Sequence, residues 1–405
     1  DGRKFTAEDV KWNLLKVTEP EQRSQLGQIA KGVENIIVAD DRSLRLEFNR
    51  PMANFSDLLV ISPMADPDTF DQIETGMFNG TGPYRLTEWN PKESVKMERF
   101  ENFVMDAPVM DSVTFLQFQD NQAQGIALEA GDVHYIHEQV SPEDYERWSA
   151  GDQIKTRAAI ERGSGWYFGL NCAIPPMDDV RVRKAMNLAM NRDRFLNEVL
   201  LIGRKMTTPW PTFSPAFDEA IDSQVTYDLD AAKALLAEAG YPDGLPEPIT
   251  CTLLPTRLAQ VRCGEIWQAD LAKIGINLEF KQTEYAEMIG MLSSGTFDQA
   301  WVGFGYGFAQ FQPATTVQTA FPLRYPNTSN YEAQEWIDVV EAIKNASGSA
   351  DELGEVYDRY TQAFVDGHFV LPFSPRTALN ARAGNLDDYL NVYGIPYFER
   401  FGFTS

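Results

Sequence analysis

Histidine and cysteine are scarce in this sequence. Its 405 residues include three histidines and three cysteines. Few side chains are therefore available for acid-base catalysis, nucleophilic catalysis or metal binding. Cys172, Cys251 and Cys263 show neither the density of a disulfide scaffold nor CxxC spacing. A Cys251–Cys263 disulfide is one expectation, and buried free thiols are the alternative.

Positive charge and long apolar runs are also in short supply. Lys and Arg total 35 against 59 Asp and Glu, which gives a formal net charge of −24. Binding to phosphate backbones requires a positive surface, so nucleic acid is not expected as a partner. No apolar run approaches the roughly 20 residues that span a bilayer, and the first five residues lack the apolar core of a signal peptide.

The motifs of catalysis are missing as well. His134 and His137 form an HxxH with Glu138 beside them, but a metalloprotease motif spaces its histidines four apart with the glutamate directly after the first. His368 precedes an apolar run and is expected to be structural. Residues 303–307 lack the spacing of a phosphate-binding loop, and no GxSxG elbow occurs. We therefore expect no catalytic residue, no metal site, no cofactor, and a protein that is not an enzyme.

Apolar residues, in contrast, are plentiful. They make up 43% of the chain, enough for several packed cores and two or three domains. A capping box at Thr6–Asp9 predicts a helix after it, and residues 43–48 alternate as a strand does. Further strands are predicted at 84–89, 112–116 and 166–170, and further helices at 121–130, after Asp179, after Asp228, at 333–344 and at 351–365.

From residue 249 onward, strand and helix patterns alternate. The predicted strands are 249–254, 277–281 and 299–303, and the helices between them are 258–274 and 285–293. This alternation predicts an α/β lobe with a mixed sheet.

Four segments stand in the order of the characteristic motifs of one family. They are DGRKFTAEDVKW at 1–12, GTGPYRLTEWNPKESVKMERFENF at 80–103, NCAIPPMDDVRVRKAMNLAMNRDRF at 171–195 and YDLDAAKALLAEAGYPDG at 227–244. They resemble family 5 of the bacterial extracellular solute-binding proteins, the dipeptide-, oligopeptide- and nickel-binding type of ABC importers. The resemblance extends over nearly the whole chain.

This resemblance implies an α/β clamp like that of type II periplasmic binding proteins, in a three-domain version with two lobes of mixed sheets and a two-strand hinge. The expected division is 1–79 as a small, N-terminally incomplete domain, 80–164 with 386–405 as lobe I, and 165–385 as lobe II. Since the family has further residues before its DG motif, the chain is expected to start late. Residues 163–165 and 391–394 are the hinge candidates.

The function that the resemblance implies is capture of a peptide or peptide-like solute in the interlobe cleft and its delivery to an ABC permease in the inner membrane. The protein would be a monomer in the periplasm, or lipid-anchored outside a Gram-positive cell. Two alternatives stay open: an oligosaccharide or an opine-like or modified amino acid as ligand, and a receptor role without transport.

The expected ligand site combines the resemblance with the aromatic content of one segment. Peptide-binding members carry an acidic residue that pairs with the peptide amino terminus, and Gly307 stands at that position here. A buried ammonium group without a carboxylate is unfavourable, so a free peptide amino terminus is not expected. Core packing is the alternative for each ring, because alternate side chains of a strand face opposite ways. The predicted ligand-binding set is Tyr285, Trp301, Phe304, Tyr306, Gly307, Phe308, Trp166, Tyr167 and Tyr393.

Overall fold

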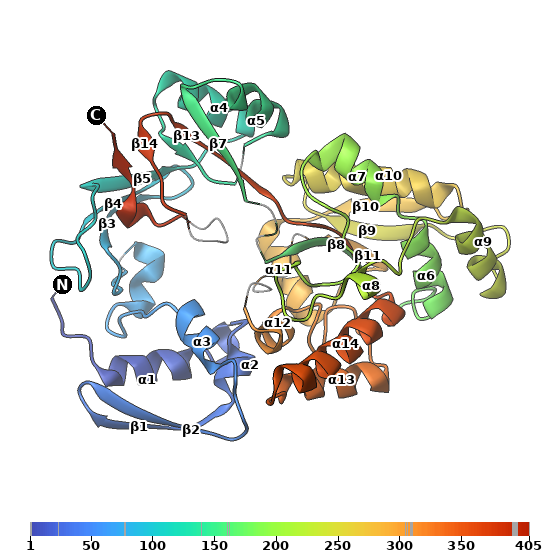
Figure 1. Cartoon of the computed structure of the whole chain (residues 1–405), viewed down its shortest axis with the longest axis horizontal. Helices are drawn as coiled ribbons and strands as arrows, with labels where there is room; N and C mark the ends of the chain where they lie inside the picture. The colour runs from blue at the N-terminus through green and yellow to red at the C-terminus, as the bar shows by residue number, and fades with distance from the viewer. Residues whose placement is uncertain are drawn as a thin grey trace.

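The computed structural model describes residues 2–22, 24–76, 78–138, 140–159, 161, 163–303, 305, 307, 311–390 and 396–404. The chain forms an N-terminal region (2–79), a small lobe (80–159 with 378–404) and a large lobe (165–375). Figure 1 shows the first two on the left, together with both chain ends, and the large lobe on the right.

The N-terminal region packs three helices against a hairpin. Helix α1 follows the predicted capping box, and the Asp9 carboxylate accepts the backbone N–H of Thr6 at 2.7 Å. Strands β1 and β2 pair in antiparallel fashion, and their elements enclose a small core around Leu14, Ile29 and Leu58. The elements are α1 (Ala7–Lys16), η1 (Pro20–Gln22), α2 (Gly27–Ala30), β1 (Val33–Asp40), β2 (Ser43–Phe48), α3 (Phe55–Ile61) and η2 (Phe70–Thr75).

Two three-stranded antiparallel sheets, in the orders β3-β4-β5 and β6-β13-β7, build the small lobe. Helices α4 and α5 cover the second sheet through Leu128 and Trp148. The elements are β3 (Tyr84–Asn90), β4 (Ser94–Arg99), β5 (Ser112–Leu116), α4 (Asn121–Ala130), β6 (Tyr135–Ile136), α5 (Pro142–Ser149), β7 (Ile154–Ala159), β13 (Ala378–Ala383), β14 (Leu386–Asp387), η4 (Phe398–Arg400) and β15 (Gly402–Phe403).

The large lobe is built on a five-stranded sheet in the order β10-β9-β11-β8-β12. β9 pairs in parallel with both β10 and β11, whereas β8 is antiparallel to both β11 and β12. The predicted mixed sheet is therefore confirmed. Its strands are β8 (Gly165–Leu170), β9 (Ile249–Leu253), β10 (Leu278–Gln282), β11 (Ala300–Gly303) and β12 (Val370–Pro375).

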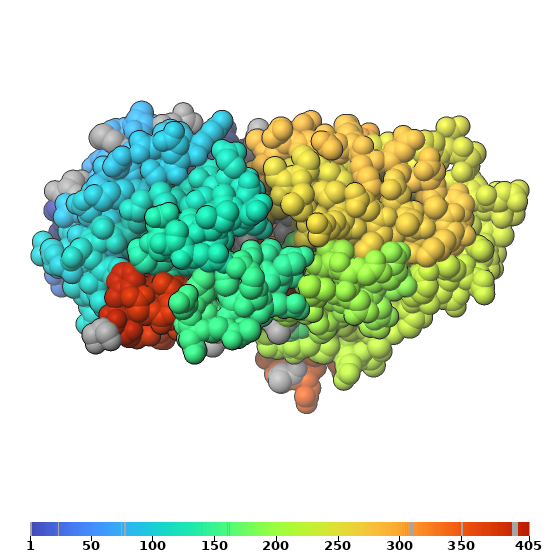
Figure 2. Space-filling model, turned by 90° about the horizontal axis from the view of Figure 1, so that it is seen from above, coloured from blue at the N-terminus to red at the C-terminus, as the bar shows by residue number. Residues whose placement is uncertain are grey.

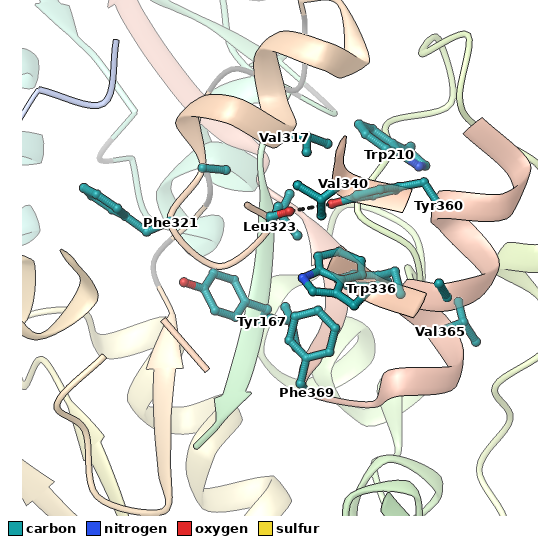
Figure 3. Packing of buried hydrophobic residues seen from close by; sticks show 14 of the residues in the cluster. Tyr167, Trp210, Val317, Phe321, Leu323, Trp336, Val340, Tyr360, Val365 and Phe369 are labelled. Atoms are coloured by element: carbon teal, nitrogen blue, oxygen red, sulfur yellow. Dashed lines mark hydrogen bonds between the residues drawn. The ribbon is translucent and has the colours of Figure 1, made fainter. Parts of the chain in front are cut away.

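Helices cover both faces of this sheet. Alternating strand residues divide between two cores: Phe168 packs on one face near Trp267 of α10, and Tyr167 packs on the other near Trp336 and Phe369. Figure 3 shows the second core, including the hydrogen bond from Tyr360 to the Leu323 carbonyl. The helices are α6 (Val180–Leu188), α7 (Arg192–Phe195), η3 (Leu196–Leu200), α8 (Glu219–Asp222), α9 (Leu229–Glu238), α10 (Leu258–Ala272), α11 (Tyr285–Ser294), α12 (Pro313–Thr319), α13 (Gln334–Lys344) and α14 (Ala350–Gly367).

The chain passes between the lobes twice. The first passage, from β7 to β8, includes Glu161 and Gly163, both in the left-handed region at φ of 57° and 68°. The second takes only Arg376 and Thr377, between β12 and β13. The Arg376 N–H donates to the Ser164 carbonyl at 2.8 Å, so the two passages lie side by side.

These pairings bear on two predictions about the hinge. Residues 163–165 lie at the first passage, as predicted, whereas 391–394 lie outside the described residues. β13, which falls inside the range predicted as lobe II, pairs with β6 and β7 in the small lobe. The return of the chain therefore comes directly after β12.

The structure also bears on the predicted disulfide and on the scarcity of long apolar runs. Cys172, Cys251 and Cys263 are all free thiols, and the latter two are fully buried, as in the alternative to a disulfide. In the part of the chain that the structure describes, none of the helices has the length and apolar character needed to cross a membrane.

Candidate ligand-binding site

One edge of the large sheet collects residues that face the small lobe. The parallel strands β9, β10 and β11 all end there, and β8 begins there, directly after the first passage between the lobes. Crevices beyond the carboxyl ends of parallel strands are the common ligand sites of open α/β sheets. Figure 2 shows a hollow between the two halves of the molecule.

Two arginines stand at this edge. Arg257 follows β9 and is the N-cap residue of α10, and Arg376 follows β12. Both guanidinium groups are partly buried. Burial, together with the positive charge of nearby Arg376, lowers the pKa of Arg257, and burial lowers the pKa of Arg376. The exposed Tyr285, at the start of α11, is close enough to both to affect these values.

The small lobe supplies a carboxylate to one of these arginines. Glu138, at a φ of 63°, forms an ion pair with Arg376. Its other carboxylate oxygen lies 3.0 Å from Nε2 of His137, and its backbone N–H donates to Oδ1 of Asn380 at 3.0 Å. The pair therefore joins the small lobe to the end of the large sheet.

A second ionic group lies beside the first passage. The carboxylate of Glu161, buried in the chain, forms an ion pair with Arg204, which also contacts Asp222 at 2.7 Å. Burial raises the pKa of Glu161, but the hydrogen bonds from Thr212 and Arg204 more than offset this and lower it overall. Glu161 is thus held ionised at the point where the chain leaves the small lobe.

The predicted aromatic set divides between surface and core. Tyr285 is exposed and Trp166 is partly buried against Phe373. Trp301 and Tyr167 have 0% and 1% of their surface exposed, which is the core-packing alternative. A ligand would reach these two rings only after movement of the surrounding side chains, and their binding role stays a prediction.

Glycines opposite these two rings explain how the core accommodates them. Trp301 is the cross-strand partner of Gly169, and Tyr167 is the partner of Gly303. A Cβ atom on either glycine would overlap the ring opposite it. Trp301 also stacks on Phe297, with ring centroids 4.5 Å apart. The sequence signal for this arrangement was the pair of glycines within apolar strands.

Of the remaining predicted site residues, the structure describes Gly307 alone. A Cβ on Gly307 would meet no atom of the other described residues within 4 Å. Phe304, Tyr306, Phe308 and Tyr393 lie outside the described residues. Arg257 and Arg376 were missed by sequence reasoning, and their positions just past predicted strands were the available signal.

The histidines have structural partners. His137 lies within hydrogen-bonding distance of Asn380, and His368 ends α14 at a φ of 45° with Nδ1 3.1 Å from Nδ2 of Asn187. Among the described residues, no group of three or more His, Cys, Asp and Glu side chains is arranged to hold a metal ion. The structural role predicted for His368 is confirmed.

A separate cavity of about 570 Å³ opens at the opposite end of β8. Cys172, Asp178, Arg183 and Tyr331 contribute to its walls. The Arg183 guanidinium there donates to the Met177 and Gly367 carbonyls at 2.8 and 2.9 Å. These guanidinium N–H groups are thus bonded to backbone carbonyls of the large lobe. Because the cavity lies at the other end of β8, it is distinct from the edge that faces the small lobe.

Comparison with known families gives a match over most of the chain. The family described as "Bacterial extracellular solute-binding proteins, family 5 Middle" matches residues 1–321. The chain is 27% identical over 292 residues to the glutathione-binding protein GsiB of Pectobacterium atrosepticum, covering 69% of this chain and 54% of that protein. For GsiB of Escherichia coli the identity is 26% over 289 residues, covering 69% and 55%. The chain thus spans about half the length of the curated relatives it matches.

Solved structures share the fold at low identity. The DppA protein from Helicobacter pylori in complex with peptide STSA has a TM-score of 0.86 at 19% identity, covering 99% of this chain and 82% of that one. AgaA from A. tumefaciens R10 in complex with agropinic acid has a TM-score of 0.85 at 19% identity, covering 100% and 84%. AppA from Bacillus subtilis in complex with a nonapeptide has 0.85 at 20%, covering 100% and 85%. These likenesses confirm the predicted two-lobe clamp.

Proposed function

This chain belongs to the bacterial extracellular solute-binding proteins of family 5, and we propose that it captures a peptide or peptide-like solute between its lobes and delivers it to an ABC permease in the inner membrane. The observation that carries the proposal is the carboxyl edge of the large sheet, where Arg257 follows β9, Tyr285 follows β10 and Trp166 lies at the start of β8, next to the first passage to the small lobe. Periplasmic location and action as a monomer, without nucleic acid, are part of the proposal.

The proposed mechanism has no chemical step, and the protein is not an enzyme. A ligand that contacts both lobes stabilises the closed clamp relative to the open one. Moving such an equilibrium from 1:99 to 99:1 takes about 5.5 kcal/mol of differential affinity. The closed form would then dock on the permease. A set of hydrogen bonds and ring contacts of the kind available at this edge can supply a difference of that size.

The proposed domains follow the pairing of the strands. Residues 1–79 form the small additional domain, 80–164 with 378–405 form lobe I, and 165–375 form lobe II. This division differs from the expected one by moving β13 into lobe I, since β13 pairs with β6 and β7. The hinge would then comprise Gly163–Gly165 and Arg376–Thr377.

A second class of ligand is favoured by one residue. Gly307 stands where peptide-binding members have an acidic residue, so an opine-like or otherwise amine-blocked amino acid, or an oligosaccharide, would lose nothing there. Agropinic acid is the ligand of one structural relative and glutathione is the ligand named for the curated relatives. A receptor role without transport would leave the binding step unchanged.

Native mass spectrometry of the freshly purified chain tests the proposal. We expect a single adduct whose fragments identify a peptide or a modified amino acid. A sugar adduct would support the oligosaccharide alternative. If no adduct is found and calorimetry with a mixed tripeptide library gives no heat of binding, the peptide proposal is wrong. Conversion of any bound compound by the pure protein would contradict the absence of an enzymatic step.

A further inference from the structure

The N-terminal region is attached to the small lobe and also touches the large one. Its chain continues into the small lobe at Gly80, which forms a bridge with Ala65. Trp89 of β3 packs against Gly76, where a Cβ would overlap the indole ring. Any bond from this region to the large lobe therefore spans the two halves of the clamp at a place other than the hinge.

Three side chains of the N-terminal region make such bonds to α12. The amide of Asn54 donates to the hydroxyl of Thr315 at 3.1 Å, and that hydroxyl donates to the Asp57 carboxylate. The guanidinium group of Arg50 donates to the side-chain oxygen of Gln318 at 2.7 Å. Asn54, Thr315 and Gln318 are all buried. In Figure 1 this contact lies below the two passages of the chain between the lobes.

Arg50 also reaches a second helix of the large lobe. Its guanidinium group lies 3.4 Å from the carbonyl of Lys344, the last residue of α13, and 3.5 Å from Oδ1 of Asn345. Cations are favoured at this end of a helix, because its carbonyls are unpaired and the dipole is negative there. Burial lowers the pKa of Arg50, and the charge of Glu341 on α13 opposes this effect. Arg50 thus joins the N-terminal region to both α12 and α13.

This contact can open without exposing an apolar core. The buried apolar residues of the N-terminal region form one cluster, and those that surround α12 form another. The bonds between the two are made by amide, hydroxyl, carboxylate and guanidinium groups, for which water is a fair replacement. Domains of one chain that move relative to each other meet through polar interfaces of this kind.

We propose that Arg50, Asn54 and Asp57 form a latch that holds the clamp closed by binding α12 and the end of α13, and that opens when the lobes separate. The inference rests on the closure proposed above and is independent of the ligand. The hinge lets the lobes rotate, and the latch sets the share of closed molecules before a ligand arrives. A ligand then has to supply less differential affinity to complete closure.

The latch is tested on the whole chain without ligand. Small-angle X-ray scattering would compare the radius of gyration of wild type, Arg50→Ala, Asn54→Ala and the double variant. Arg42→Ala is the matched control, an exposed arginine in the turn between β1 and β2. We expect a larger radius in each latch variant, with the largest in the double variant, and the wild-type radius in Arg42→Ala. Arg50→Lys, which keeps the charge but not the forked donors, should lie between wild type and Arg50→Ala.

Hydrogen exchange followed by mass spectrometry gives the second readout. Amides in residues 312–319 should exchange at least about threefold faster in the latch variants than in wild type or Arg42→Ala. Faster exchange there with an unchanged radius of gyration would mean that these side chains only support α12 locally, which overturns the latch. Equal radii in all the variants overturn it as well.

Neither readout uses a ligand, so this inference and the proposed function can fail separately. Larger radii in the latch variants, together with no heat of binding from the tripeptide library, would support the latch and count against peptides as the ligand class. Tripeptide binding by wild type, together with equal radii throughout, would leave peptide capture standing and overturn the latch.

Discussion

Asp57 and Thr315, 258 residues apart in the sequence, are joined by a hydrogen bond of 2.6 Å from the threonine hydroxyl to the carboxylate. The same carboxylate oxygen accepts the Gln312 backbone N–H at 3.1 Å. Asp57 of α3 therefore caps the N-terminus of α12 in the large lobe. Arg50 makes a second such contact by donating to Gln318 of α12 at 2.7 Å. Figure 1 shows α2 and α3 beside α12.

We expect Asp57→Ala to lower the free energy of unfolding by about 1–2 kcal/mol, since it removes a helix cap and a charged hydrogen bond. Urea unfolding followed by circular dichroism measures the change. Asp106→Ala is the matched control, because Asp106 is exposed and makes no described contact. Equal stability of the two variants would mean that the contact contributes nothing to the folded state.

Gly169→Ala and Gly303→Ala should each destabilise the large lobe by about 1–3 kcal/mol, because a Cβ would overlap Trp301 or Tyr167 in a close-packed core. Gly290→Ala provides a control of opposite sign. Gly290 lies inside α11 with nothing near its would-be Cβ, so alanine there should stabilise by about 0.5–1 kcal/mol. Unfolding midpoints in urea would show the contrast, and a loss at Gly290 as large as that at Gly169 would contradict this account.

His368 should make stability depend on pH. Burial, reinforced by Lys184, Arg183 and Arg192, lowers its pKa to about 3, while an unfolded histidine titrates near 6.5. The unfolded chain therefore binds one more proton between these values. This contribution to stability is present above about pH 6.5 and is lost as the pH falls, with a slope of up to about 1.4 kcal/mol per pH unit.

Comparison of wild type with His368→Asn isolates this effect, because asparagine tolerates the left-handed backbone at that position. The difference in unfolding free energy between the two proteins should shrink from pH 7 to pH 4.5. His134→Asn, at an exposed position, should leave the pH dependence as in wild type. A difference that does not change with pH would show that the pKa of His368 is the same in the folded and the unfolded chain.

Thiol labelling should find three free cysteines in the unreduced, unfolded protein and slow labelling in the folded one. Burial raises the pKa of all three thiols, that of Cys172 to about 11 and that of Cys263 to about 12. Cys172, the least buried, should react first. A count of one thiol after unfolding would indicate the Cys251–Cys263 disulfide instead.

Local signals in the sequence located many elements well. The predicted strands 43–48 and 112–116 match β2 and β5 in full, and the helix predicted after Asp228 begins at Leu229. Asp228 caps it through the Ala231 N–H at 2.9 Å. Caps, glycines and alternation act over a few neighbouring residues, so their effects can be read from a short stretch of chain.

Long-range pairing could not be obtained in this way. β13 carries no mark that distinguishes a strand of the small lobe from one of the large lobe, and its partners lie more than 200 residues away. Arg257 and Arg376 were missed for the same reason. They meet because the order of strands in the sheet brings the ends of β9 and β12 to one edge, and only the family resemblance suggested that this edge holds a ligand.

Gly165 and Pro375 are partners across β8 and β12, so the segment 165–375 begins and ends at one place. A segment with adjacent ends can be inserted into a host domain without stretching either. The large lobe is therefore a continuous insertion in the sequence of the small lobe, between β7 and β13. Both cores of the large lobe lie within this segment, so exchange with the corresponding segment of a relative would transfer Arg257 together with the rest of the large lobe.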